Sequence, residues 1–521
     1  MATFEWIIAL LIAAVLLAGL ARRLAAPYPT FLAIGGACLA FIPNSPSWTL
    51  DPELALALFV APVLLDAAYD TSLRDLRDNW APVGGLVFVA VIATTAAVAF
   101  VARWLVPDMP WPVAIALGAI VAPPDAAAAT AIVRQVKLPH RLVKILEGES
   151  LLNDASALLI YRLAILALTT GGLTWAQAGP AFLITVIGSA AAGYALARVT
   201  PVLVRLFDDA PSSIIVQFAT TFSVWIFAEH VGLSGILTIV VYAMTLSRRI
   251  GSRMPARLRV PSYAVWEATV FILNAFAFVL IGLQLRPIWE RLDQTLRVEY
   301  GAVALSVLAT VIVVRLGWVM SYNKAIRMKI ARYGFRPRHA MSPPTVQGGI
   351  IISWAGMRGI VTLAAAFALP ETLPGGGAFP YRDLILLTAF CVVLGTLVIQ
   401  GLTLKPLIAA LKLDDGDPVG REIGWARAEA YRAALAAIDG DETIEAKIVR
   451  KEYQALLAAA GDGEDQRAAG ELPGDRVRRA VIAAARRHMD ELRLKGVIGD
   501  DAYHVLEEEF DWAELSAAEG R

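Results

Sequence analysis

Residues 116–161 read ALGAIVAPPDAAAATAIVRQVKLPHRLVKILEGESLLNDASALLIY, and no other run of the chain indicates more about its structure. Two apolar segments flank a short basic turn. The first carries Pro123-Pro124-Asp125 at its centre, and the second carries Asp154 among Leu, Ile and Ala. A carboxylate at a bilayer centre costs roughly 3 kcal/mol or more, so such residues mark a function by default.

The composition favours a membrane protein. The 521 residues are 57% hydrophobic and 18% charged, whereas soluble domains are about 25% charged. The mean hydropathy is +0.60. The two cysteines lie in apolar segments, and the five histidines lack metal-ligand spacing. No phosphate-binding loop, dinucleotide glycine pattern or nucleophile elbow occurs. We therefore expect neither an enzyme nor a bound cofactor, and no nucleic-acid partner.

Charge divides the chain into two parts. Up to Leu413 there are 31 Lys and Arg against 21 Asp and Glu, and from Asp414 onward there are 15 against 25. The acidic part also has helical periodicity interrupted by Gly and Asp. We predict a transmembrane domain over residues 1–410 and a small helical cytoplasmic domain over residues 411–521.

Apolar segments that can span a bilayer recur along the first part. A spanning helix needs about 20 mainly apolar residues. The thirteen candidates are 4–21, 28–43, 52–70, 82–105, 111–133, 142–169, 179–204, 213–229, 232–248, 262–284, 299–320, 347–369 and 382–409.

The connections between these segments alternate in charge. One alternate set holds 21 Lys and Arg, and the other holds about five. Basic residues accumulate in cytoplasmic loops. We therefore expect a multi-pass protein of the cell membrane, with the N-terminus outside and the tail in the cytoplasm.

Two of the segments are interrupted. The fifth carries Pro123-Pro124, and the twelfth carries GMRG at 356–359. They stand seven segments apart, which is typical of transporters built from inverted repeats. The predicted fold is all-α, with about thirteen transmembrane helices, two inverted repeats (segments 1–6 and 8–13) and broken helices 5 and 12 that cross. Unwound backbone there would leave carbonyls free near mid-membrane.

Polar side chains on segment 6 suggest an ion site. Ser150 and Asp154 are four residues apart and share a helix face. Hard cations prefer oxygen ligands, which Asp154, Ser150, Asp125 and the Pro124 carbonyl can supply. Desolvation favours the neutral form of a carboxyl group. Such a group binds a proton or a cation in competition, which is the chemistry of exchange.

Several polar residues have two interpretations. Asn153 either belongs to the site or holds crossing helices together by hydrogen bonds. Ser150 either faces the ion or bonds back to its own helix. Asp66 either adds polarity to the site or lies near the inner interface. Arg358, in the break of segment 12, has Asp66 or the local backbone as its candidate partner.

Two charged residues are predicted to lie at the same depth in the membrane. Glu149 and Arg315 each lie about seven residues from the cytoplasmic end of their segment, which corresponds to roughly 10 Å. We expect them to form a buried structural ion pair.

The segment LEGESLLNDASALLIY (146–161) resembles the Asn-Asp signature of the monovalent cation/proton antiporters, which include bacterial NhaP proteins and animal sodium/proton exchangers. The likeness covers essentially all of residues 1–410. It is carried also by APVLLDAAYDTSLRDLR (61–77), APPDAAAATAI (122–132), GLSGILTIVVYAM (232–244), VWEATVFILNAFAFVLIGLQL (265–285), WAGMRGIVTLAAAFALP (354–370) and LTAFCVVLGTLVIQGLTL (387–404).

This resemblance implies a homodimer of thirteen-helix protomers, with a core domain moving against a dimerisation domain. It implies that Asp154 binds the transported proton and cation, surrounded by Asp125, Ser150 and Asn153. There are two departures. Pro124-Asp125-Ala126 replaces the common Thr-Asp-Pro, and Asp66 stands where the family commonly has Glu.

The function we expect is secondary antiport of a monovalent cation, Na⁺ first, for H⁺, serving pH and sodium homeostasis. Asn153-Asp154 carries one charge where two aspartates would carry two, so we expect electroneutral exchange. The alternatives are a K⁺/H⁺ antiporter of the same fold, with Li⁺ also possible as a substrate, or a tail-gated cation channel. Partners are the lipid bilayer and a second copy; a regulator of the tail is unknown.

Overall fold

The structure is a computed structural model, and every regular element in the residues it describes is a helix. The described residues are 2–24, 26–42, 52–125, 138–170, 175–204, 206–250, 254–334, 344–373, 377–413, 418–461, 475–495, 506 and 509–514. They form two compact units, Met1–Asp414 and Asp415–Arg521.

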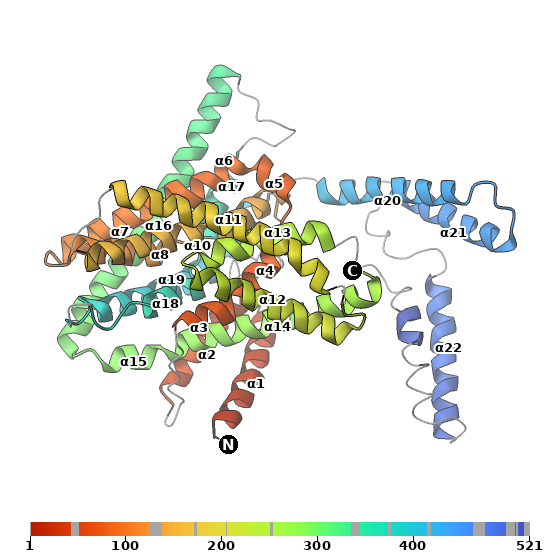
Figure 1. Cartoon of the computed structure of the whole chain (residues 1–521), viewed down its shortest axis with the longest axis horizontal. Coiled ribbons are helices and arrows are strands. Elements are labelled where there is room, and N and C mark those ends of the chain that lie inside the picture. The colour runs from red at the N-terminus through yellow and green to blue at the C-terminus, as the bar shows by residue number, and fades with distance from the viewer. Residues whose placement is uncertain are drawn as a thin grey trace. The chain divides into compact units, whose positions relative to one another are not determined.

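Figure 1 labels the helices of the first unit. In chain order they are α1 (Ala2–Arg23), α2 (Tyr28–Ala40), α3 (Pro52–Ala55), η1 (Leu56–Val60), α4 (Ala61–Tyr69), α5 (Leu73–Asp78), α6 (Trp80–Gly84), η2 (Gly85–Ala90), α7 (Val91–Leu105), α8 (Trp111–Val121), α10 (His140–Thr169), α11 (Trp175–Val204), α12 (Ala210–His230), α13 (Gly235–Ile250), α14 (Ala256–Leu283), α15 (Leu285–Glu290), α16 (Gln294–Tyr333), α17 (Val346–Trp354), α18 (Ile360–Phe367) and α19 (Arg382–Leu411).

Eight helices in the described residues are long and apolar enough to cross a membrane. They are Phe4–Arg23, Trp80–Leu105, His140–Thr169, Phe182–Val204, Ala210–His230, Ala256–Glu290, Gln294–Tyr333 and Arg382–Leu411. Two further apolar helices, α2 and α8, are shorter. The last part of the predicted span 111–133, from residue 126 onward, lies outside the described residues. The count of thirteen spans stays a prediction.

The longest helix shows how the sequence sets helix ends. α16 begins after Asp293, whose carboxylate accepts a hydrogen bond from the Leu296 amide at 2.9 Å. Such an N-cap satisfies one of the free amides of the first turn. The helix ends at Gly334, which has φ +59°. Glycine adopts this left-handed conformation without the steric cost that a Cβ brings.

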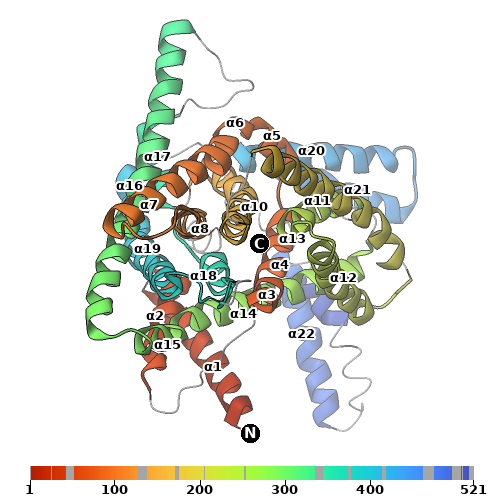
Figure 2. The same cartoon turned by 60° about the vertical axis from the view of Figure 1, so that its left-hand side comes forward.

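The helices of the first unit form two groups around α10 (Figure 2). On one side α10 packs on α8, which packs on α7, and α16 joins α7 to α19. On the other side α11, α12 and α4 pack on α13. α14 crosses to pack on α2 and also contacts α12 and α18. α10, which carries Asp154, thus lies where both groups meet.

Two π-helical stretches, η1 and η2, interrupt the helices on either side of α5. π-helical turns are rare and often occur at functional sites. Phe59 and Val60 of η1 line the cavity described below. The Val87 carbonyl of η2 accepts a hydrogen bond from Ser156 of α10 at 2.7 Å. η1 therefore lines the cavity, and η2 contacts the helix that carries Asp154.

Two non-helical stretches lie against each other. α8 ends at Val121, and α17 and α18 are separated by residues 355–359. The Asp125 amide donates to the Met357 carbonyl at 2.7 Å. Backbone from Pro123-Pro124-Asp125 therefore meets backbone from the Gly356–Gly359 stretch inside the apolar unit.

Close helix packing relies on glycine between α2 and α14. A Cβ at Gly36 would lie 2.2 Å from the Val279 carbonyl oxygen, and one at Gly282 would lie 2.3 Å from the Ala33 carbonyl oxygen. Helices in membranes associate through such small residues, which let backbones approach.

The second unit is helical too, with α20 (Pro418–Ala437), α21 (Ile444–Gly461) and α22 (Asp475–Leu494). α20 packs on α21 through Tyr431 and Tyr453, whose rings meet edge to face at 5.7 Å. Arg478 of α22 pairs with Glu452 of α21 at 2.7 Å. The periodicity of the sequence also predicts a helix over residues 501–516, and most of these residues lie outside the described ones.

Candidate functional site

A cavity of about 720 Å³ lies within the first unit. It is lined by residues of both helix groups, from η1, α4 and α10 to α11, α12, α13, α14 and α18. Its lining includes Asp70, Lys144, Val204, Leu246 and Met254, which adjoin the strongly basic connections. The cavity therefore reaches the basic side of the unit.

Asp154 lies at the far end of this cavity. On α10 the lining residues recur every three or four positions, from Lys144 through Glu147, Ser150 and Leu151 to Asp154. That spacing is one face of a helix. Ten residues at 1.5 Å rise place Asp154 roughly 15 Å further along α10 than Lys144.

The Asp154 carboxylate is buried and has no hydrogen-bond donor among the described residues. Asp154 is 6% exposed, and in the described part of the chain no group donates to its carboxylate. Buried charges in membrane proteins normally pair with one another or with backbone groups. An unpaired carboxylate facing a cavity is therefore available to bind a proton or a cation.

Asp125 joins Asp154 in lining the cavity. Its side chain lies directly against Gly359, because a Cβ built on Gly359 would be 1.5 Å from Asp125 Oδ2. Any other residue at position 359 would displace the carboxylate. The backbone before α18 thus fixes the position of Asp125, which lies in the non-helical stretch after α8.

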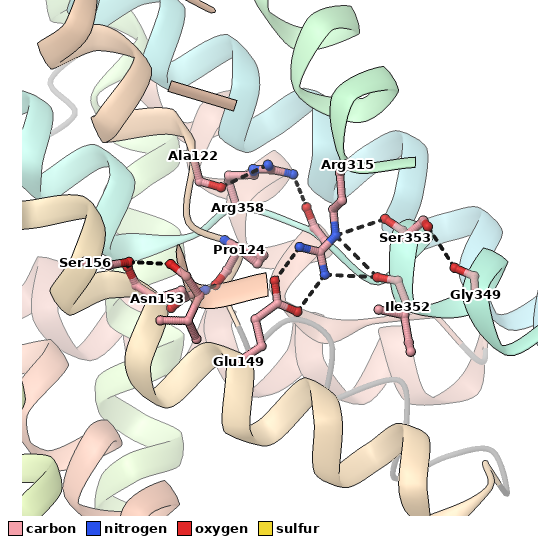
Figure 3. A network of polar contacts seen from close by, with 12 residues as sticks. Ala122, Pro124, Glu149, Asn153, Ser156, Arg315, Gly349, Ile352, Ser353 and Arg358 are labelled. Atoms are coloured by element: carbon pink, nitrogen blue, oxygen red, sulfur yellow. Dashed lines mark hydrogen bonds and ion pairs between the residues drawn. The ribbon is translucent and has the colours of Figure 1, made fainter. Parts of the chain in front are cut away.

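Asn153 contacts backbone rather than the cavity. It is fully buried, and its Nδ2 donates to the Pro124 carbonyl at 2.9 Å (Figure 3). Its Oδ1 has no partner in the described residues. Ser156, one turn later, donates to the Asn153 carbonyl at 2.8 Å. Asn153 therefore holds α10 against the backbone after α8, and it occupies one acceptor site of the Pro124 carbonyl.

Glu149 and Arg315 meet in a bidentate ion pair (Figure 3). Their side chains are 2% and 3% exposed, and Arg315 Nη2 lies 2.8 Å from Glu149 Oε2. Arg315 also donates to the Ile352 carbonyl at 2.9 Å and to the Ser353 carbonyl at 3.2 Å. These carbonyls are at the C-terminal end of α17, where a positive charge is favourable. The pair therefore joins α10, α16 and α17.

Arg358 uses backbone partners, the second of the alternatives drawn from the sequence. It is 1% exposed and donates to the carbonyls of Val121 and Ala122, each at 3.1 Å, and to that of Gly356. In the described residues its guanidinium pairs with no carboxylate. It therefore places a positive charge at the C-terminal end of α8.

Ser150 and Asp66 line the same cavity and are both partly buried. Ser150 stands one turn before Asp154 on the cavity face of α10. Asp66 lies on α4, between η1 and the mouth of the cavity. In the described residues no group of three or more His, Cys, Asp and Glu could hold a metal ion. A cation bound here would need hydroxyl, amide or carbonyl oxygens beside its carboxylates.

The wall facing α10 contains polar residues that the sequence analysis did not single out. Trp266 Nε1 donates to Gln217 Oε1 at 3.0 Å, and Gln217 donates to Ser262 at 3.2 Å. Tyr242 donates to Thr200 at 3.0 Å. All five line the cavity. These residues come from four helices, α11 to α14, and only the tertiary packing brings them to one cavity.

Comparison with protein families matches residues 8–410 to the model described as sodium/hydrogen exchanger, transmembrane. A sodium, potassium, lithium and rubidium/H⁺ antiporter of Bacillus pumilus is 32% identical over 397 residues, which are 74% of this chain. This chain spans 58% of the length of that protein. An uncharacterized Na⁺/H⁺ exchanger of Mycobacterium tuberculosis is 29% identical over 98% of this chain and 95% of its own length.

Among solved structures, the sodium proton antiporter MjNhaP1 from Methanocaldococcus jannaschii superposes with a TM-score of 0.62. The match covers 79% of this chain and 98% of that one, at 16% sequence identity. At this identity the likeness shows a common fold.

Proposed function

The chain belongs to the sodium/hydrogen exchanger family, a family of secondary transporters, and from this premise we propose that it exchanges Na⁺ for H⁺ across the cell membrane. The observation that carries the proposal is Asp154. Its carboxylate is 6% exposed and faces the cavity without a donor in the described residues. The other fully buried charges, Glu149, Arg315 and Arg358, all have partners. Asp154 is thus the group free to alternate between ligands.

Charge balance supports one-for-one exchange. Apart from the cavity residues nearer its mouth, such as Asp66, three carboxylates (Asp125, Glu149, Asp154) and two guanidinium groups (Arg315, Arg358) lie in or beside the cavity, and together they carry one net negative charge when all are ionised. One proton or one monovalent cation neutralises the set, whereas a second proton would add an unpaired charge in an apolar region. We therefore propose that Asp154 alone alternates, with Asp125 staying ionised, so that the exchange is electroneutral.

The cavity supports alternating access. It reaches the side of the basic connections, which the positive-inside rule places in the cytoplasm. Beyond Asp154, toward the other end of α10, Arg162 pairs with Glu229 of α12 at 2.7 Å. This pair joins the two helix groups on the side opposite the cavity mouth. We propose that it is broken when the site opens outward.

The proposal extends to the number of helices, their symmetry and the oligomeric state. We propose thirteen transmembrane helices in two inverted repeats, with the stretches at 122–125 and 355–359 as the breaks of crossed helices 5 and 12. We propose a homodimer with the N-terminus outside. The acidic unit Asp415–Arg521 would lie in the cytoplasm as a regulatory or dimer-supporting domain.

The named relatives suggest a second candidate for the transported cation. The Bacillus relative is named for sodium, potassium, lithium and rubidium, so K⁺/H⁺ or Li⁺/H⁺ exchange is the second candidate. At the site, Pro124-Asp125-Ala126 offers no threonine hydroxyl, which leaves Asp154, Asp125, Ser150 and the Pro124 carbonyl as the proposed oxygen ligands.

Proteoliposomes loaded with a pH-sensitive dye test this proposal. An outward or inward gradient of Na⁺, Li⁺ or K⁺ should drive a pH change of the opposite sense. With the potential clamped by potassium and valinomycin, the equilibrium pH change for Na⁺ should not depend on voltage. Since 100 mV is worth about 2.3 kcal/mol per charge, one net charge per cycle would shift that pH difference by well over one unit. Cation flux without proton movement would indicate a channel instead.

A further inference from the structure

Asn274 lies at the closed end of the cavity, and the proposed exchange cycle does not use it. The face of α14 that lines the cavity consists of Arg259, Ser262, Tyr263, Trp266, Glu267, Val270, Phe271 and Asn274. These positions recur every three or four residues, so they form one stripe. Asn274 is the last of them, roughly 18 Å along the helix from Ser262.

The stripe on α14 runs parallel to the stripe on α10. Each helix begins just after a strongly basic connection, and each stripe leads away from it, ending at Asn274 on α14 and at Asp154 on α10. Ile360 and Val361 of α18, a helix that contacts α14, line the same part of the cavity. They directly follow Gly359, which touches Asp125. The two stripes therefore bring Asn274 to the end of the cavity that holds both aspartates.

The amide oxygen of Asn274 accepts no hydrogen bond from the residues that the structure describes. The residue is 5% exposed, and its Oδ1 has no hydrogen-bond partner among the described residues. It interrupts an apolar run, FILNAFAF. A buried polar atom without a partner is destabilising, and because Asn274 also lines the cavity, a ligand that enters the cavity can satisfy this oxygen.

We propose that Asn274 is a specificity-determining residue, which supplies its amide oxygen to the cation held by Asp154. This inference rests on the proposed exchange function. An amide oxygen is a neutral ligand for a hard cation. It leaves the charge balance of the site unchanged, so it affects which cation binds rather than how many charges move. A proton on Asp154 has no comparable need for it, so the amide favours the cation in their competition.

The test measures Michaelis constants for Li⁺, Na⁺, K⁺ and Rb⁺ with the full-length protein in proteoliposomes. Asn274→Leu removes the oxygen and keeps a branched side chain with the same number of non-hydrogen atoms, and Asn274→Ser keeps one oxygen. Gln400→Leu is the matched control. Gln400 of α19 is a fully buried amide whose polar atoms have no partner in the described residues, but it does not line the cavity.

We expect Asn274→Leu to raise the Michaelis constant of the preferred cation about two- to tenfold, the effect of one ordinary polar contact. The ratios between cations should shrink, Asn274→Ser should recover part of them, and Gln400→Leu should leave them unchanged. Wild-type constants and ratios in Asn274→Leu, or an equal change in Gln400→Leu, would overturn the assignment. If Asn274→Leu does not reach the membrane, the ratios of Asn274→Ser decide, and unchanged ratios overturn it.

The exchange function and the role of Asn274 are tested by different variants. Exchange that persists in Asp154→Asn would remove the basis of the proposed function. Exchange lost in Asp154→Asn but unchanged in Asn274→Leu would reject only the role of Asn274.

Discussion

Removing either member of the Glu149–Arg315 pair should destabilise the first unit strongly. Both side chains are at most 3% exposed, and the two-pronged contact satisfies both carboxylate oxygens. Breaking a buried pair by deleting one partner costs about 3–5 kcal/mol, because the other charge stays buried and unpaired. Arg315→Ala and Glu149→Ala should each cost this much. Arg315→Ala also removes the donor to the carbonyls of Ile352 and Ser353.

The double variant should lose much less than the sum of the two. The second deletion removes the very charge that the first left unpaired, so the coupling should approach the upper end of about 0.5–3 kcal/mol found for contacting residues. Glu149→Gln, which keeps the side-chain volume, separates loss of charge from loss of packing.

Thermal unfolding of the purified protein in detergent measures these changes. The control pair is Arg286–Glu290 on α15, which are 2.7 Å apart but 39% and 61% exposed. Exposed pairs contribute at most about 1 kcal/mol, so Arg286→Ala and Glu290→Ala should hardly change the midpoint. Additive losses from the two buried variants, or losses no larger than in the control pair, would refute the reasoning.

Three further changes test other parts of the account. Gly359→Ala should abolish or strongly reduce sodium-driven proton movement in vesicles, because its Cβ would lie 1.5 Å from Asp125 Oδ2; wild-type exchange would show that Asp125 need not be held there. Arg162→Gln should loosen the closure opposite the cavity mouth. The ratio of the external to the internal Michaelis constant for Na⁺ should then fall by up to about fivefold, and Arg286→Gln should leave it unchanged. The same ratio in wild type and in Arg162→Gln would contradict this expectation. A variant ending at Lys412 should retain exchange in liposomes with a shifted pH profile, and an inserted, dimeric truncation that is inactive at every pH would place the tail in the transport machinery.

Local spacing in the sequence predicted much of the site. Ser150 and Asp154 share one face of α10 because a helix repeats every 3.6 residues, and both line the cavity. Glu149 and Arg315 lie equally far from the basic ends of their segments, which predicted that they pair. The structure brings them into contact. Such arguments succeed because regular helices and a bilayer of fixed thickness convert residue number into position.

Contacts that depend on tertiary packing could not be predicted from residue spacing along single helices. The partner of Arg358 stayed undecided, since backbone carbonyls at the end of α8 leave no mark in the sequence. Arg162 lies near the end of its helix, and nothing local indicates that it reaches Glu229 of α12. The π-helical stretches η1 and η2 have no distinguishing residue pattern. Asn274 faces the site only because α14 runs parallel to α10.

Exchange by Asp154 itself is tested by one comparison in proteoliposomes. Wild-type protein and Asp154→Asn are reconstituted at equal density with a pH-sensitive dye inside, and an Na⁺ gradient is imposed under a valinomycin clamp. The substitution keeps the side-chain shape but removes the charge that binds the proton and the cation in turn. We predict a sodium-driven pH change in wild type and none in correctly inserted Asp154→Asn. A pH change of wild-type rate and extent in Asp154→Asn would contradict the assignment of Asp154 as the exchanging group.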